Sequence, residues 1–266
     1  MTQANQDIVD LKGRIGFITG AGRGVGRQVA LHLANHGAGG VVVNDFNLER
    51  AEGVAAEVEA LGVPALAVQG DVSDFDGVGT LFEQARARFG RVDLLVNNAG
   101  NAGPTGGPNL DPPFWTQQAS DWSKYLDVNL FGVLNCTRHA LPGMVENGYG
   151  RIVTVISDAG RVGEPGLEIY SAAKAGAAGF MRGVARSVGR YQITANSVAL
   201  AATRTPFVEE SMADEEMAKA QLKRYIIRRF GEPEDAANMI LFLSSDASSW
   251  ITGQTFPVNG GYSVNQ

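Results

Sequence analysis

RIGFITGAGRGVGRQVALHLA (residues 14–34) contains a short apolar run, a glycine-rich loop and a stretch with helical periodicity, in that order. The run RIGFIT at 14–19 is typical of a buried strand. Val25, Val29 and Leu33 follow at intervals of four on one face of a helix that Gly37 can end. A strand, a tight turn and a helix in this order predict the first part of a βαβ unit.

The same alternation continues along the whole chain. Because the apolar runs lack in/out alternation, they are typical of strands covered by helices on both faces. The sequence predicts an α/β fold, a single Rossmann-like domain over residues 1–266 with a doubly wound parallel sheet of about seven strands and helices on both faces. The predicted strands span residues 14–19, 41–45, 65–70, 92–97, 151–157, 193–199 and 255–259.

Two segments interrupt this alternation, and each follows the carboxyl end of a predicted strand, where such sheets bind ligands. Residues 101–118 are rich in Gly and Pro, and residues 199–230 form a polar amphipathic stretch. We interpret both as substrate loops. Phe114 and Trp115 either cover an apolar substrate or anchor the first loop.

Composition excludes several classes of protein. The net charge of −6 without a dense Lys/Arg stripe argues against a nucleic-acid partner. No apolar run approaches the roughly 18 residues needed to span a bilayer, and the first residues lack the apolar region of a signal peptide. Cys136 is the only cysteine, which suits a reducing compartment, so we expect a cytoplasmic protein without membrane association.

The glycine-rich loop predicts a pyrophosphate site. Backbone without Cβ atoms can turn tightly and approach a phosphate, whose charge is favoured at a helix N-terminus. Val25 stands where the common G-x-G-x-x-G pattern has its third glycine, so the loop instead fits T-G-x-x-x-G-x-G. The residues expected to bind the cofactor here are Gly20, Gly22, Arg23, Gly24, Val25 and Gly26.

Asp45 ends the second predicted strand, 19 residues after Gly26. An acidic side chain there would bind the adenosine ribose hydroxyls and repel a 2′-phosphate, which favours NAD as the cofactor. Alternatively, Asp45 is only the N-cap of the next helix. Arg23 could bind a 2′-phosphate, which leaves NADP open.

Six motifs in order resemble those of the short-chain dehydrogenase/reductase family over nearly the whole chain. They are TGAGRGVG (19–26), DV (71–72), NNAG (97–100), Asn129, Ser157 and YSAAK (170–174). The resemblance implies that Asp71 and Val72 contact the adenine and that Asn97, Ala99 and Gly100 line the cofactor cleft. It also implies that Asn129 holds a water linked to the catalytic lysine and that Thr205 lies near the carboxamide.

Tyr170 and Lys174 are four residues apart, so both side chains leave the same face of a helix. An adjacent ammonium and an oxidised nicotinamide would both favour the phenolate, making Tyr170 a general acid/base. Ser157 would orient the substrate oxygen. Lys174 would also hold the nicotinamide ribose. We therefore expect Lys174, and with it the neighbouring Tyr170, to be both catalytic and cofactor-binding.

Two further features qualify this interpretation. His32 and His36 are four residues apart, but no third ligand is evident, so we expect no metal. Leu200 and Ala201 stand where the family usually has Pro-Gly, which can alter the chain path beside the nicotinamide.

We expect an NAD(H)-dependent oxidoreductase that interconverts a secondary alcohol and a ketone, acting on a largely apolar small molecule. Alternatives are an NADP-dependent 3-oxoacyl thioester reductase and a nucleotide-binding protein without turnover. By resemblance we expect a homotetramer built through the long helices and the C-terminal segment, with a dimer as second choice.

Overall fold

The computed structural model describes residues 7–101, 112–205 and 215–264, which form a seven-stranded parallel sheet with the order β3-β2-β1-β4-β5-β6-β7. The predicted doubly wound sheet and all seven strands are confirmed. The strands are β1 (Ile15–Ile18), β2 (Gly40–Asp45), β3 (Ala65–Gln69), β4 (Leu94–Asn97), β5 (Gly150–Ser157), β6 (Ile193–Leu200) and β7 (Thr255–Val258).

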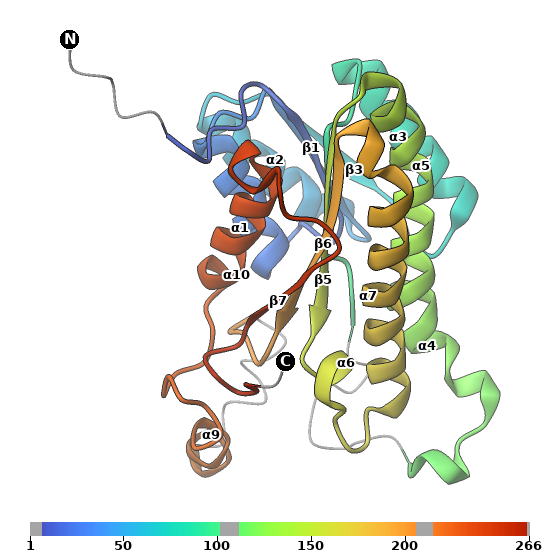
Figure 1. Ribbon diagram of the computed structural model, residues 1–266, viewed down its shortest axis with the longest axis vertical. Helices are drawn as coiled ribbons and strands as arrows, with labels where there is room; N and C mark the ends of the chain where they lie inside the picture. The colour runs from blue at the N-terminus through green and yellow to red at the C-terminus, as the bar shows by residue number, and fades with distance from the viewer. Residues whose placement is uncertain (1–6, 102–111, 206–214, 265–266) are drawn as a thin grey trace.

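Helices cover both faces of the sheet, as the continuous apolar strands require (Figure 1). One face packs against α1 (Gly24–Asn35), α2 (Leu48–Ala60) and α10 (Pro233–Ser244). The other packs against α3 (Phe75–Phe89), α5 (Gly132–Asn147) and α7 (Glu168–Val188). In this second layer Phe17 stacks on Phe82 with ring centroids 4.4 Å apart, so strand and helix are in direct contact.

The strand order reverses between β1 and β4, which opens a crevice at the carboxyl ends of these two strands. The short helices α6 (Ala159–Val162) and α9 (Glu215–Leu222) lie at this edge, at the bottom of Figure 1. Residues 102–111 and 206–214 of the two predicted substrate loops lie outside the described residues.

β6 extends one residue further than predicted, to Leu200, which pairs with Ser157 of β5 and Val258 of β7. Because leucine has an amide hydrogen and ordinary backbone preferences, the ladder continues where a Pro-Gly pair would interrupt it. No helix in the described ranges is both long and apolar enough to cross a membrane.

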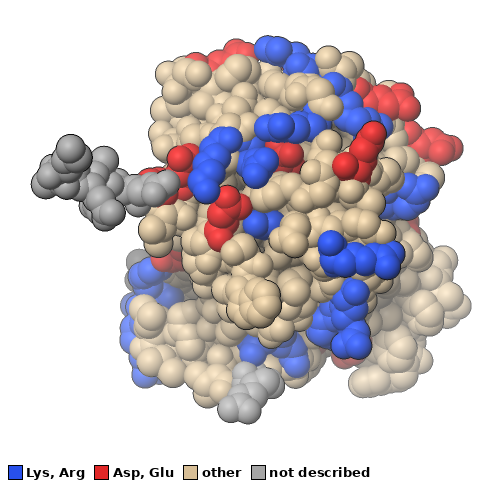
Figure 2. All heavy atoms as spheres, turned by 45° about the horizontal axis from the view of Figure 1, so that its top comes forward, with Lys and Arg blue, Asp and Glu red and all other residues tan. Residues whose placement is uncertain are grey.

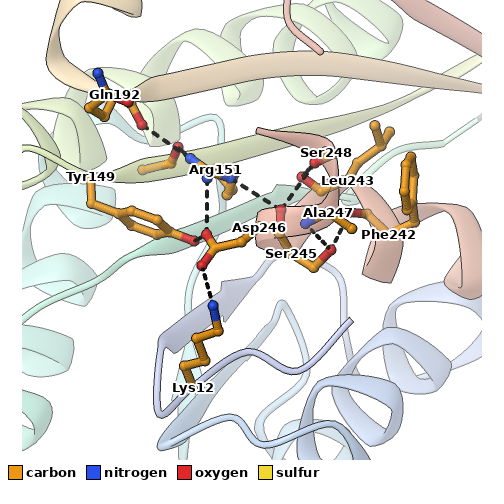
Figure 3. Close-up of polar contacts among 11 residues, drawn as sticks. Lys12, Tyr149, Arg151, Gln192, Phe242, Leu243, Ser245, Asp246, Ala247 and Ser248 are labelled. Atoms are coloured by element: carbon orange, nitrogen blue, oxygen red, sulfur yellow. Dashed lines mark hydrogen bonds and ion pairs between the residues drawn. The ribbon is translucent and has the colours of Figure 1, made fainter. Parts of the chain in front are cut away.

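The opposite edge of the sheet carries intermixed Lys, Arg, Asp and Glu side chains (Figure 2). Arg151 of β5 is only 4% exposed, and its guanidinium donates to the carbonyl oxygens of Gly150 and Gln192 at 3.0 and 3.1 Å. It also donates to Asp246 at 3.1 Å (Figure 3). The same carboxylate accepts from Lys12 and from the Tyr149 hydroxyl. Asp246 therefore connects its own segment with that of Lys12 and with that of Tyr149 and Arg151, all far apart in the sequence.

Burial alone would raise the pKa of Asp246, but hydrogen bonds from Lys12 and Tyr149 and the nearby positive charges together lower it. A carboxyl with a lowered folded pKa contributes stability above its unfolded pKa, near 3.9, and loses it as the pH falls through the folded value. The network is thus expected to weaken only in acid.

We predict that Asp246→Asn lowers the free energy of unfolding by about 1–2 kcal/mol at pH 7, because the variant weakens a half-exposed ion pair and its hydrogen bonds. In urea titrations the difference from wild type should shrink as the pH falls from about 5 towards the lowered folded pKa. Glu52→Gln, at an exposed position of α2, is the matched control and should change stability by less than about 0.5 kcal/mol. A difference that does not vary with pH would contradict the assignment.

Candidate active site

A cleft of about 870 Å³ lies at the carboxyl edge of the sheet. It is lined by the loops after β1 to β6, by α7 and by the segment after β7. Most of the predicted site residues line it: Gly20, Arg23, Gly24, Val25, Asp45, Asp71, Val72, Ala99, Gly100, Ser157, Tyr170, Lys174 and Thr205. The parallel strands therefore bring together residues that lie between positions 20 and 205 of the chain.

The glycine loop packs so closely against the end of β4 that side chains would not fit. Gly20 has a φ of +60°, and a Cβ there would lie 2.8 Å from the Cα of Ala99. A Cβ on Gly26 would lie 2.6 Å from the carbonyl oxygen of Gly20. α1 begins at Gly24 without a side-chain cap, which leaves its first amides available to an anion. This cradle fits a pyrophosphate.

Asp45 lies at the end of β2 and is only 8% exposed. It accepts hydrogen bonds from the amides of Gly22 at 2.9 Å and Asn47 at 3.0 Å. The alternative interpretation of Asp45 as the N-cap of α2 is wrong, because Asn47 is the N-cap and accepts from the amide of Arg50.

Cationic and aromatic side chains also surround this end of the cleft. Arg23 is exposed, and Arg50 and Phe46 line the cleft beside it. Phe46 is 73% exposed, which is unusual for a large apolar side chain. Sequence analysis missed Phe46 and Arg50, although both follow Asp45 closely in the chain.

Two further predicted cofactor residues lie at the mouth of the cleft. The Asp71 carboxylate accepts from the amide and the hydroxyl of Ser73, at 2.9 and 2.7 Å, which holds it in place. Thr205 lies against the glycine loop, where its Cγ2 would be 3.1 Å from a Cβ on Gly24.

Asn97 does not line the cleft, contrary to expectation. Its amide donates to the hydroxyls of Thr137 and Thr154 in the core, both at 3.2 Å, because alternate residues of a strand point to opposite faces. Asn98 lines the cleft instead and donates to the carbonyl oxygens of Thr19 and Gly20. Gly22, Gly26 and Asn129 are not among the residues that line the cleft.

Tyr170 and Ser157 meet in the cleft. Ser157 ends β5, and its hydroxyl accepts from the amide of Ala159 at 3.2 Å. Burial raises the pKa of the Tyr170 phenol, and a hydrogen bond with Ser157 opposes this only in part. Burial is therefore the larger of the two effects on this phenol in the protein alone.

Lys174 is 4% exposed, and its ammonium donates to the carbonyl oxygen of Val155 at 3.0 Å. The nitrogen stands 5.8 Å from the centroid of the Tyr170 ring. Burial lowers the pKa of Lys174 to about 8, so the side chain is still mostly protonated at neutral pH. The site holds a positive charge deep in the cleft.

Asn129 lies directly behind Gly100, in a π-helical turn (Asp127–Phe131) between α4 (Ser123–Leu126) and α5. Its side chain donates to the carbonyl oxygen of Asn101 at 2.8 Å and accepts from the amide of Asn101 at 3.3 Å. A Cβ on Gly100 would lie 2.9 Å from its Oδ1 and 3.0 Å from the Lys174 Nζ. Asn129 thus holds the chain after β4 close to the lysine.

The far end of the cleft combines Arg224 and Tyr225, from the predicted substrate loop at 199–230, with Glu164 and Tyr262, which sequence analysis did not single out. The Tyr262 hydroxyl donates to Glu164 at 2.8 Å, and Arg224 stands 3.5 Å from the same carboxylate. Tyr225 is buried, and its hydroxyl accepts from the amide of Ala202. This end of the cleft is more polar than the substrate loops suggested.

Phe114 and Trp115 are not among the residues that line the cleft. Phe114 stacks on Trp122 with centroids 6.0 Å apart, which fits the anchoring interpretation, whereas Trp115 is 83% exposed. His32 and His36 contact different partners, Asn238 and Asp7. Among the residues that the structure describes, no group of three His, Cys, Asp or Glu could hold a metal.

We predict that Gly26→Ala weakens binding of NADH at least about tenfold, because its Cβ would meet backbone atoms of the loop that cannot move independently. Gly53→Ala is the matched control, since Gly53 is an exposed position of α2, where an added Cβ would have nothing within 4 Å. It should leave binding unchanged and stabilise the protein by up to about 1 kcal/mol. Fluorescence titration with NADH and thermal unfolding measure both, and equal binding by the two variants would contradict the role of the loop.

The chain matches known proteins over nearly its whole length. A family model described as enoyl-(acyl carrier protein) reductase matches residues 20–263. The 3-oxoacyl-(acyl-carrier-protein) reductase FabG of Staphylococcus aureus is 38% identical over 92% of this chain and 96% of its own. The 7alpha-hydroxysteroid dehydrogenase of Escherichia coli is 35% identical over 97% of each.

Solved structures agree with these matches. A 7 alpha-hydroxysteroid dehydrogenase complexed with NADH and 7-oxo glycochenodeoxycholic acid superposes with a TM-score of 0.89 at 34% identity, covering 99% of this chain and 100% of that one. A putative short-chain alcohol dehydrogenase from Sinorhizobium meliloti gives a TM-score of 0.88 at 33% identity, covering 96% and 98%. With its sheet order, its glycine cradle and these matches, the chain belongs to the short-chain dehydrogenase/reductase family and is an oxidoreductase of that family.

Proposed function

We propose that the protein is an NAD(H)-dependent oxidoreductase that interconverts a secondary alcohol and a ketone, with Tyr170 as general acid/base. The observation that carries this proposal is the meeting of the Tyr170 phenol with the Ser157 hydroxyl in a cleft that also holds the buried Lys174 ammonium. A protein that only bound a nucleotide would not need this arrangement.

The residues divide the work as follows. The nicotinamide, when bound, supplies or accepts the hydride. The Ser157 hydroxyl orients the substrate oxygen, and the Tyr170 phenol gives its proton to that oxygen during reduction and takes it back during oxidation. Since burial keeps the phenol protonated at neutral pH, Tyr170 is ready to act as an acid. The Lys174 ammonium, held by Val155, favours the phenolate that forms.

Tyr170→Phe should lower kcat by about 10²- to 10⁴-fold, because it removes the transferable proton but keeps the ring. Binding of NADH, followed by fluorescence, should stay close to wild type, and so should the thermal midpoint. Turnover is measured with NAD and a panel of secondary alcohols. Tyr191→Phe, on a partly buried tyrosine far from the cleft lining, is the control. Wild-type turnover in the Tyr170→Phe protein would refute the assignment.

NAD is the preferred cofactor because Asp45 presents a carboxylate, held by the amides of Gly22 and Asn47, at the ribose end of the cradle. The negative charge of a 2′-phosphate would be repelled by this carboxylate, because the two would lie close together where burial limits solvent screening. The relative solved with NADH supports the same choice. Arg23 and Arg50 act in the opposite direction, since guanidinium groups suit phosphate.

The ratio of kcat/KM for NADH to that for NADPH should therefore exceed one in the wild type and fall by about tenfold or more in Asp45→Ser, since the repulsive carboxylate is lost. Arg23→Ala should move the ratio the other way or leave it unchanged. A wild-type preference for NADPH would overturn the role of Asp45.

A second candidate is an NADP-dependent 3-oxoacyl thioester reductase. It is favoured by the two arginines beside Asp45 and by the 38% identity with a 3-oxoacyl-(acyl-carrier-protein) reductase. The same chemistry at Tyr170 and Ser157 would serve it. Reduction of acetoacetyl-coenzyme A with NADPH, faster than any reaction in the alcohol panel with NAD, would select this candidate.

The remaining expectations on substrate, assembly and location stay predictions. Tyr262, Arg224 and Glu164 give the far end of the cleft a polar wall, which suits a substrate with polar groups distant from its ketone. Self-association through α5 and α7 is supported by a mainly apolar hollow between them, lined by residues that include Leu134, Leu141 and Phe180. Buried Cys136 agrees with the expected cytoplasmic location.

A further inference from the structure

Asp158 is a buried acidic residue that the proposed mechanism does not use. It directly follows Ser157 and is only 2% exposed, although it belongs to the cleft lining. A buried carboxylate is costly unless donors surround it, so its partners indicate what it holds in place.

Those partners come from two distant parts of the chain. One oxygen accepts from the Arg161 guanidinium at 2.7 Å, within α6. The other accepts from the side-chain amide of Asn259 at 2.6 Å, just after β7 and 101 positions away in the sequence. Asp158 thus joins the loop that carries Ser157 to the C-terminal segment.

The C-terminal segment is itself a tight turn that presents Asn259. The Asn259 amide also donates to the Ser263 carbonyl oxygen at 3.0 Å, and its own oxygen accepts from the amide of Gly261. Gly260 and Gly261 have φ values of +59° and +76°, which glycine adopts without strain. The Ser263 hydroxyl accepts from Arg161 at 3.0 Å and closes the ring of bonds around Asp158.

The backbone of Asp158 lies next to the contact that the Ser157 hydroxyl makes. The amide of Asp158 donates to the Leu200 carbonyl oxygen at 2.9 Å, which ties the turn to β6. The next amide, that of Ala159, donates to the Ser157 hydroxyl at 3.2 Å. The position of Ala159 depends on the turn that Asp158 anchors. Asn259 is therefore linked to Ser157 by its hydrogen bond to Asp158, the turn that follows, and the hydrogen bond from the Ala159 amide.

We propose that Asp158 and Asn259 are positioning residues that hold the Ser157 hydroxyl in the orientation that substrate reduction requires. This inference rests on the proposed function, in which Ser157 orients the substrate oxygen. A small displacement of such a group lowers turnover strongly, because the reacting atoms must stay aligned.

The test is a double-mutant cycle between Asn259→Ala and Ser157→Ala, with kcat and KM measured using NADH and the ketone of the best alcohol in the panel. Asn259→Ala should lower kcat about tenfold in the Ser157 background with KM for NADH unchanged. In the Ser157→Ala background it should change kcat less than about twofold, because the group it positions is gone. An equal loss in both backgrounds would overturn the proposal and leave only a general structural role.

A second measurement does not depend on turnover. Amide exchange at Ala159, followed by NMR, should be at least about tenfold faster in Asn259→Ala, because the turn that protects this amide is no longer anchored. Asn238→Ala removes another asparagine side-chain hydrogen bond, an exposed one to His32 on α1, and should leave both kcat and this exchange unchanged. Unchanged exchange in Asn259→Ala would also overturn the proposal.

The two measurements separate the inference from the function on which it rests. If the wild type reduces nothing in the panel, the proposed function fails, and exchange at Ala159 alone decides whether Asn259 anchors the turn. If Asn259→Ala does not fold, Ser263→Ala replaces it, since it removes the hydroxyl bonded to Arg161 and leaves the contact between Asn259 and Asp158. It should act in the same direction with a smaller loss of about threefold.

Discussion

The close approach of the loop after β1 to the chain after β4 is the constraint on which the site depends. Gly20 and Gly26 allow backbone of the first loop to lie against Ala99 and Asn98, at distances that any Cβ would prevent. The same approach places the start of α1 over the crevice where the strand order reverses. The shape of the cradle for a dinucleotide therefore depends more on glycines, which lack side chains, than on any specific contact.

A buried positive charge is the second feature that organises the cleft. Lys174 loses most of its hydration, which lowers its pKa to about 8, and the carbonyl oxygen of Val155 compensates only in part. Such a buried charge lowers the stability of the fold. The ammonium lies next to Gly100 and Asn129, and a side chain larger than hydrogen at position 100 would displace it. The structure thus keeps an electrostatically unfavourable group where it can act on the Tyr170 phenol.

Local patterns in the sequence predicted much of this correctly. The seven strands, the glycine loop and the pairing of Tyr170 with Lys174 on one helix depend on neighbours in the chain, so short-range periodicity was sufficient. Asn97 illustrates the limit, because a family motif cannot show which of two adjacent asparagines points into the cleft. Side-chain alternation along β4 decides this, and it places Asn97 in the core between Thr137 and Thr154.

The sequence by itself determined the order of strands and helices, the glycine cradle and the presence of Ser157, Tyr170 and Lys174, because each is encoded by residues within one or two turns of chain. Only the tertiary structure decided which distant groups meet. The Asn259 side chain donates a hydrogen bond to Asp158, 101 positions away in the sequence, and the Tyr262 hydroxyl donates one to Glu164, 98 positions away. These contacts depend on the parallel strands ending at one edge of the sheet, where loops without any shared sequence pattern are brought within hydrogen-bonding distance.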